Sequence, residues 1–208
     1  NLNEPLMVLG FAGPGLVGGI AVSHIIEKLA LKKIAHVRSK YIPPAVVFFN
    51  GKLRHPFRIY SDEDGKICVV VCELPLRSNG AYSIAACLLD WAENKGAKEV
   101  VVLDGFPVQT LPKERKTYCA AEEEKRRHCQ EMGVDMISAG IVGGIAGSIL
   151  NECLTRRILG VAYLTPAVFF LPDPKGATTL IETLNLLYNL SVDTKELVDK
   201  AEEIKKEL

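Results

Sequence analysis

The sequence lacks an excess of either charge. It has 25 basic and 25 acidic side chains among 208 residues, so its formal net charge at pH 7 is zero. Proteins that neutralise many phosphates usually carry a basic excess or a basic stripe. The one charge-rich segment, residues 113–131, holds six Lys or Arg against five Glu, which favours a solvated helical face. Nucleic acid is therefore not an expected partner.

Long apolar runs are also missing. No stretch reaches the roughly 18–20 unbroken apolar residues that a membrane span needs. No charged segment followed by an apolar run and a cleavage site is visible either. We therefore expect a cytoplasmic protein without a membrane partner.

Cysteine pairs at metal-binding or redox spacing are absent. None of the six cysteines forms a C-x-x-C motif, which excludes a zinc ribbon and a thioredoxin-type site. Most lie in apolar runs, where a free cysteine behaves as a small hydrophobe, and this suits a reducing compartment. Cys87 and Cys153 are expected inside apolar helices with unreactive thiols. Cys119 and Cys129 lie in the polar segment, where we expect greater exposure.

Sequence signatures of catalysis are missing too. The four histidines do not form H-E-x-x-H, no serine lies in G-x-S-x-G, and no G-K-[ST] follows the glycine-rich segments. His24 is expected to be a hydrogen-bonded core or interface residue rather than a ligand or base. We predict no catalytic residue, no metal and no cofactor.

Strand-like and helix-like segments alternate along the chain, which predicts an α/β layered sheet with one antiparallel hairpin. Strands are expected at residues 5–11, 34–39, 45–50, 57–74 (the hairpin, around D-x-D-G), 97–105, 133–140 and 158–166. Helices are expected at 15–31, 78–96 (capped by Ser78 or Asn79), within 106–131 after a loop, at 140–156, from Pro174, and at 193–208. No linker interrupts this pattern, so we predict a single domain, 1–208, whose C-terminal helix begins with a capping-box spacing.

The segment "GFAGPGLVGG", residues 10–19, contains the dinucleotide-binding pattern G-x-G-x-x-G at Gly13, Gly15 and Gly18. Such a site also needs an acidic residue near the end of the second strand. Residues 32–41 contain no Asp or Glu, and Pro14 removes an amide donor from the loop. A dinucleotide site is therefore disfavoured.

The same glycine-rich device occurs twice, as "GLVGGIA" at 15–21 and as "GIVGGIA" at 140–146. Each copy follows a strand-like run and opens a helix-like one. The favoured interpretation is close packing of the helices, permitted by Gly18, Gly19, Gly143 and Gly144. A ligand or anion site at these junctions is the alternative that stays open.

Two acidic residues close predicted strands. Glu73 follows "CVVVC" and Asp104 follows "VVVL", and ligands of α/β sheets gather at the carboxyl ends of strands. Together with the glycines these acids define a candidate ligand cleft of Gly13, Gly15, Glu73 and Asp104. The preferred alternative is that both acids are buried and cap backbone amides of nearby turns.

Several longer segments carry a family resemblance. "GFAGPGLVGGIAVSHIIEKL", "RSKYIPPAVVFFNGKLRHPFRIY", "VVVLDGFPV", "SAGIVGGIAGSILNECLTRRILGVAYL" and "PDPKGATTLIETLNLL" occur in this order. The chain resembles the proteasome-assembly-chaperone family, and more narrowly its archaeal homologues. The resemblance implies a three-layer α/β sandwich of phosphorylase/hydrolase-like fold with a mainly parallel central sheet. It also implies a homo-oligomeric assembly factor.

Members of that family that bind the proteasome α-ring use a C-terminal tail ending hydrophobic–Tyr–any residue. The sequence ends Lys206-Glu207-Leu208 and departs from that pattern. The leading hypothesis is a non-enzymatic scaffold that binds itself and proteasome α subunits or a related assembly, its last helix projecting the tail. One alternative is a phosphorylase- or hydrolase-like enzyme acting on a small polar metabolite at the Gly15/Asp104 cleft. Another is an oligomer with an unrelated partner.

Overall fold

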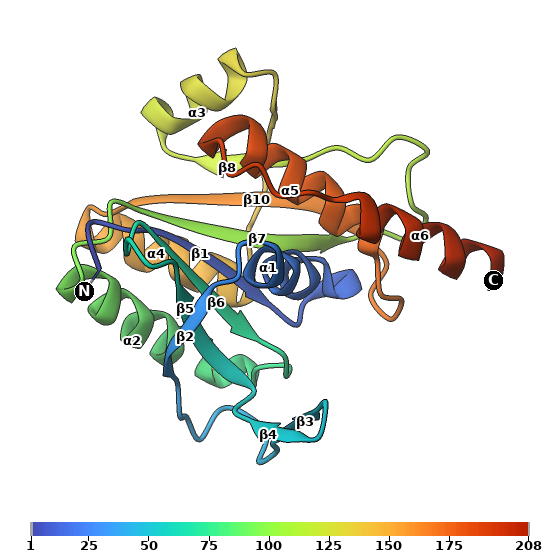
Figure 1. Cartoon of the computed structure of the whole chain (residues 1–208). Coiled ribbons are helices and arrows are strands. Elements are labelled where there is room, and N and C mark those ends of the chain that lie inside the picture. The colour runs from blue at the N-terminus through green and yellow to red at the C-terminus, as the bar shows by residue number, and fades with distance from the viewer. Residues whose placement is uncertain (1, 208) are drawn as a thin grey trace.

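A central eight-stranded sheet organises the chain in the computed structural model, which describes the backbone of residues 2–207 and the side chains of residues 2–203 (Figure 1). The strand order is β2-β5-β6-β1-β7-β10-β8-β9. The strands of this sheet are β1 (Leu6–Phe11), β2 (Lys32–His36), β5 (Phe57–Ser61), β6 (Ile67–Cys72), β7 (Glu99–Pro107), β8 (Tyr118–Ala121), β9 (Asp135–Met136) and β10 (Leu159–Ala167). The helices are α1 (Val17–Lys28), α2 (Ala81–Asn94), α3 (Glu123–Glu131), α4 (Gly144–Arg156), α5 (Pro174–Tyr188) and α6 (Lys195–Glu207).

The four central strands, β6, β1, β7 and β10, run parallel. Their sequences are continuous apolar runs, such as the fully buried "ICVVVC" of β6, because helices cover both faces of the sheet. One core cluster joins the sheet to α1 and α5, and the other joins it to α2 and α4. The predicted three-layer α/β sandwich with a mainly parallel sheet is confirmed (Figure 1).

Antiparallel strands flank this parallel centre. β5 and β6 form the expected hairpin around the D-x-D-G turn, and β2 pairs with β5. On the other side β8 pairs antiparallel with β10. The sequence interpretation placed a loop where β8 lies and a longer strand where β9 has two residues.

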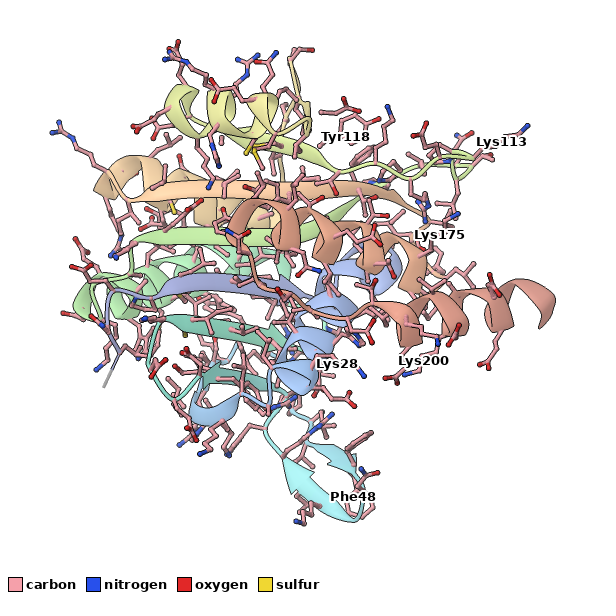
Figure 2. All side chains as sticks on the ribbon, turned by 45° about the horizontal axis from the view of Figure 1, so that its top comes forward. Lys28, Phe48, Lys113, Tyr118, Lys175 and Lys200 are labelled. Carbon is pink, nitrogen blue, oxygen red and sulfur yellow. The ribbon has the colours of Figure 1, made fainter. Side chains whose placement is uncertain are left out.

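A second, two-stranded sheet forms a hairpin of β3 (Val47–Phe49) and β4 (Lys52–Arg54). The apolar pattern "AVVFFN" predicted the first of these strands but not its partner. The hairpin lies apart from the large sheet, and Phe48 points away from the body of the protein at its tip (Figure 2). Its apolar side chains are therefore not part of the core.

The helix starts differ in how they are capped. α5 begins at Pro174, as expected, and Asp173 accepts a hydrogen bond from the backbone N–H of Gly176. α2 follows a 3-10 turn, Ser78–Gly80, and no side chain caps it. The expected cap at Ser78 or Asn79 is therefore wrong.

The last helix, α6, packs against α5 and is tied to α1. Glu196 pairs with Lys28 of α1 at 2.8 Å and with Lys200 at 2.7 Å, and both lysines are visible in Figure 2. Asp193 precedes the helix and accepts a hydrogen bond from the N–H of Lys195. Leu197 of α6 is buried.

The two edges of the large sheet are short or charged. β2 begins with exposed Lys32 and Lys33, and its pairing with β5 is irregular between Lys33 and Ala35. β9, at the other edge, has two residues. Over the helices that the structure describes, none is both long and apolar enough to cross a membrane.

Candidate functional site

A cleft of about 470 Å³ opens at the carboxyl ends of β1, β7 and β10. It lies where ligands of parallel α/β sheets usually bind. Its lining is mostly apolar and comes from residues 11–14, 76–78, 104–107 and 141–145, with Ala81, Leu164 and Phe169. Asp104 and Arg77 are the charged side chains among these lining residues.

Asp104 ends the buried part of β7 and faces the glycine-rich turn after β1. Its Oδ1 accepts a hydrogen bond of 2.8 Å from the backbone N–H of Gly105. A Cβ atom on Gly13 would lie 2.3 Å from that same oxygen, so a side chain at residue 13 would displace the carboxyl group. Burial raises the pKa of the Asp104 carboxyl to about 6, and the hydrogen bond from Gly105 opposes this shift. The structure thus brings together two of the four predicted cleft residues, Gly13 and Asp104.

Gly15 has a different surrounding. It is buried with φ +61°, and a Cβ atom there would lie 2.9 Å from Cβ of Ala167. Its carbonyl oxygen accepts a hydrogen bond of 2.9 Å from the N–H of Asp173. Asp173 also pairs with Arg115, and both side chains are nearly buried. Gly15 therefore belongs to the junction between the first turn and α5, outside the lining of the cleft.

Glu73 also lies away from Asp104. Its two carboxylate oxygens pair with Arg54 at 2.7 Å and with Arg58 at 2.8 Å. This is an ion-pair cluster that joins β4 and β5 to the end of β6, not the amide cap that the sequence favoured. Glu73 contributes instead to a second cleft of about 520 Å³ beside α1, which Leu197 and Lys200 of α6 also line.

The two copies of the glycine-rich motif have different surroundings in the structure. In the first copy, a Cβ atom on Gly18 would lie 2.1 Å from the carbonyl oxygen of Leu103, and one on Gly10 would lie 2.2 Å from the carbonyl oxygen of Gly18. The predicted close packing is confirmed at Gly18, while Gly19 has only an ordinary 3.4 Å neighbour.

In the second copy, a Cβ atom on Gly143 or Gly144 would meet nothing within 4 Å. Close packing at these two residues is therefore wrong. Both glycines line the Asp104 cleft. The motif therefore allows close packing before α1, at Gly18, but has open space before α4, at Gly143 and Gly144.

The predicted histidine and cysteine environments are partly confirmed. His24 is 5% exposed and its Nε2 lies 2.7 Å from the carbonyl oxygen of Asp193, as expected for a hydrogen-bonded core residue. Cys153 is buried, and burial raises the pKa of its thiol to about 12. Two other cysteine predictions are wrong: Cys87 is exposed on α2, and Cys119 and Cys129, expected to be more exposed, are buried.

Sequence reasoning missed a buried polar chain that links these last two cysteines to the amino-terminal end of β7. Cys129 lies 3.4 Å from the hydroxyl of Tyr163, which lies 3.1 Å from the hydroxyl of Tyr188. Tyr188 donates a 2.6 Å hydrogen bond to Glu99, and Lys125 pairs with the same carboxylate at 2.8 Å.

Burial and hydrogen bonds within this series of polar side chains shift the pKa values of several of its members. A hydrogen bond from the Cys119 thiol lowers the pKa of Cys129, and burial raises the pKa of Tyr163 and of Tyr188. Lys125 lies in the segment that its charge pattern assigned to solvent, and only the packing of α3 against β8 and α5 reveals its burial. These buried polar contacts connect α3 and α5 to β7 and β10 of the sheet.

Metal ligation finds no support in the part of the chain that the structure describes, because no group of three or more His, Cys, Asp or Glu side chains is suitably placed there.

Exposed apolar side chains concentrate in two places. The first is the β3–β4 hairpin, where Phe48 and Leu53 are each 70% exposed and Val46 and Phe49 are more than half exposed. The second is the rim of the Asp104 cleft, where Ile141 is 98% exposed and Phe169 packs on Phe170 with ring centroids 5.5 Å apart. Exposed apolar groups gathered in this way mark surfaces that bind other molecules.

Comparison with known proteins relates the whole chain to one family. The model of the PAC2 family matches residues 7–208. The uncharacterised protein MJ0106 of Methanocaldococcus jannaschii is 30% identical over 206 residues, which is 99% of this chain and 84% of that relative.

Two solved structures share the fold. A protein from Thermoplasma acidophilum has 38% sequence identity and a TM-score of 0.89, with 99% of this chain and 84% of that chain covered. PbaA of Pyrococcus furiosus, described as an archaeal homolog of proteasome-assembly chaperone, has 24% identity and a TM-score of 0.92, with 100% and 87% covered. The resemblance to archaeal homologues of the proteasome-assembly chaperones, predicted from the sequence, is confirmed.

Proposed function

Since the chain belongs to the PAC2 family, we propose that it is a non-enzymatic, homo-oligomeric scaffold of the cytoplasm that binds proteasome α subunits or a related assembly. The observation that carries this proposal is the extent of the likeness. The family match spans 7–208, and the fold of PbaA, a homolog of a proteasome-assembly chaperone, aligns over the whole chain.

The exposed apolar side chains support a role in protein contacts. Leaving several large apolar groups in water is unfavourable, and burying each one in an interface contributes about 1.5–3 kcal/mol. Phe48 and Leu53 present such groups from a hairpin that adds nothing to the core. We propose that this hairpin is buried against another protein chain in the working assembly.

The proposal is tested by mixing the full-length protein with purified proteasome α subunits and recording native mass spectra. A complex of defined stoichiometry, together with an oligomer of the protein alone, is the expected result. A monomer that forms no complex over a range of salt concentrations would contradict both parts of the proposal.

The contribution of the hairpin is tested with the double variant Phe48→Asp, Leu53→Asp. We expect it to weaken either self-association or α-subunit binding at least about tenfold, because each buried aromatic or aliphatic anchor contributes more than 1 kcal/mol to binding. The matched control is Leu186→Asp, which changes an exposed apolar residue of α5 outside the hairpin. If the double variant and the control weaken binding equally, the hairpin is not part of the interface.

A further inference from the structure

The scaffold function does not account for the Asp104 cleft, and in particular not for Gly143. Its φ of −104° and ψ of −173° are extended backbone that any residue adopts. A Cβ atom there would meet nothing within 4 Å. Neither packing nor backbone conformation therefore requires glycine at this position. Gly143 lines the cleft and contributes no side chain to its wall.

The floor of the cleft carries one carboxyl group that is only half satisfied. Oδ1 of Asp104 accepts the hydrogen bond from Gly105, whereas Oδ2 makes no hydrogen bond or ion pair with the residues that the structure describes. Gly13 faces the carboxyl group without a side chain. The free oxygen is thus available to a molecule in the cleft.

The chemistry of the lining selects the kind of molecule. A negative carboxylate in a mostly apolar cleft is poorly solvated, which is consistent with its raised pKa, and a bound cation would stabilise it. Phe106, Val142 and Leu164 offer apolar contacts above it. An anionic ligand would be repelled by Asp104 and attracted by Arg77, the other charged lining residue, so an anionic analogue is the critical comparison in the test. The volume of about 470 Å³ falls within the range of small-molecule sites.

We propose that the cleft binds a small, mainly apolar molecule carrying a protonated amine, with its ammonium group hydrogen-bonded to Asp104 and its apolar part against the cleft walls. Such a ligand donates to the unpartnered oxygen and replaces water on the apolar side chains. This inference does not depend on the scaffold function, because the cleft lies apart from the β3–β4 hairpin.

The binding test uses three amines of increasing size, isopentylamine, 2-phenylethylamine and tryptamine, with the full-length protein at pH 7.5. Titration calorimetry and ligand-detected NMR measure binding, and 2-phenylethanol and phenylacetate are the neutral and anionic analogues of the second amine. We expect at least one amine to bind and to bind more tightly than a neutral analogue of the same shape. Failure of all three amines at millimolar concentration, or tighter binding of phenylacetate, overturns the proposal.

Two variants locate the binding. Asp104→Asn keeps the acceptor for Gly105 but loses the charge, and we expect at least about a tenfold loss of amine affinity, since charge-assisted hydrogen bonds are the stronger kind. Gly143→Leu fills the open wall and should abolish binding. Asp64→Asn, at an exposed turn, is the control and should leave the affinity unchanged.

Thermal unfolding of each variant checks that it is folded. If Asp104→Asn does not fold, loss of amine binding in Gly143→Leu still places the amine in this cleft. If neither variant changes amine affinity, the amine binds at another surface and the proposal is overturned. A further check is the 13C titration of the Asp104 carboxyl, which shares the cleft with Arg77, the other charged lining residue: the pKa of Asp104 should fall when the amine is bound.

Discussion

The carbonyl oxygen of Leu103 occupies the space into which a side chain at residue 18 would project: a Cβ atom on Gly18 would lie 2.1 Å from it. This contact brings α1 down onto β7 at the strand–helix junction. It is the physical reason for one glycine of the apparent nucleotide-binding pattern. Packing, rather than a phosphate, requires it.

Gly18→Ala is therefore expected to destabilise the protein by about 2–3 kcal/mol, because a buried methyl group without space forces the backbone apart. Urea unfolding followed by circular dichroism measures the change. Gly143→Ser is the matched control, since residue 143 has open space and precedes α4 in the N-cap position, where serine is favoured. A Gly18→Ala protein as stable as this control would contradict the close contact.

Asp104 makes stability depend on pH. Its folded-state pKa of about 6 lies above the ordinary value of 3.8, so the folded protein disfavours the charged form. The folded state is then relatively most stable below pH 4, and this advantage is lost as the pH rises from about 4 to 6, by up to about 3 kcal/mol. Asp104→Asn should thus stabilise the protein at pH 7.5 more than at pH 4.5.

Urea unfolding at these two pH values checks the sign of the effect. The control is Asp64→Asn, which removes an exposed carboxyl at a turn. An Asp104→Asn variant that is less stable than the parent at pH 7.5 would show that the carboxylate is better solvated than its position suggests.

Lys125 and Glu99 form a nearly buried ion pair, with their side chains 9% and 11% exposed. Removing one partner leaves a buried charge without compensation, so Lys125→Met should destabilise the protein by about 3–5 kcal/mol. Adding Glu99→Gln to that variant should restore part of the loss. Lys116→Met, which breaks a half-exposed pair with Asp135, should change stability by less than about 1 kcal/mol.

The cysteines should differ in reactivity by exposure. Cys87 is exposed, whereas Cys119 and Cys129 are 0% exposed. Iodoacetamide should modify Cys87 first and leave Cys119 and Cys129 intact until the protein unfolds, although a hydrogen bond from the Cys119 thiol lowers the pKa of Cys129. Peptide mass mapping over time measures the order. Rapid modification of Cys129 in the folded protein would mean that α3 opens readily.

The sequence was sufficient for the elements whose patterns are long and local. The apolar runs of β1, β6 and β7 and the helix that starts at Pro174 are examples. It failed at β8, because Tyr118–Ala121 is short and adjoins a charged segment, and only pairing with β10 makes it a strand. The partner strand β4 likewise depends on a turn at residues 50–51 that the sequence interpretation did not use.

The candidate cleft could be predicted only in part, because some of its residues are placed by neighbouring strands and others by long-range contacts. Asp104 and Gly13 meet because β1 and β7 are neighbours in the sheet, which their position at parallel strand ends suggests. Glu73 follows β6, which is also next to β1, but its carboxylate pairs with arginines of β4 and β5 instead of lining the Asp104 cleft. Long-range partners of this kind leave no local pattern. The open space at Gly143 could not be predicted, because the segments around Gly18 and Gly143 have nearly the same sequence and only Gly18 is tightly packed.

The edges of the large sheet restrict how copies of the chain can join. β2 exposes Lys32 and Lys33 at an irregular pairing, and β9 is two residues long, so neither edge offers a long row of free backbone groups. A neighbouring subunit cannot readily extend the sheet by β-augmentation. The proposed oligomer is therefore expected to form through side-chain contacts, so that single substitutions should disrupt it without unfolding each subunit.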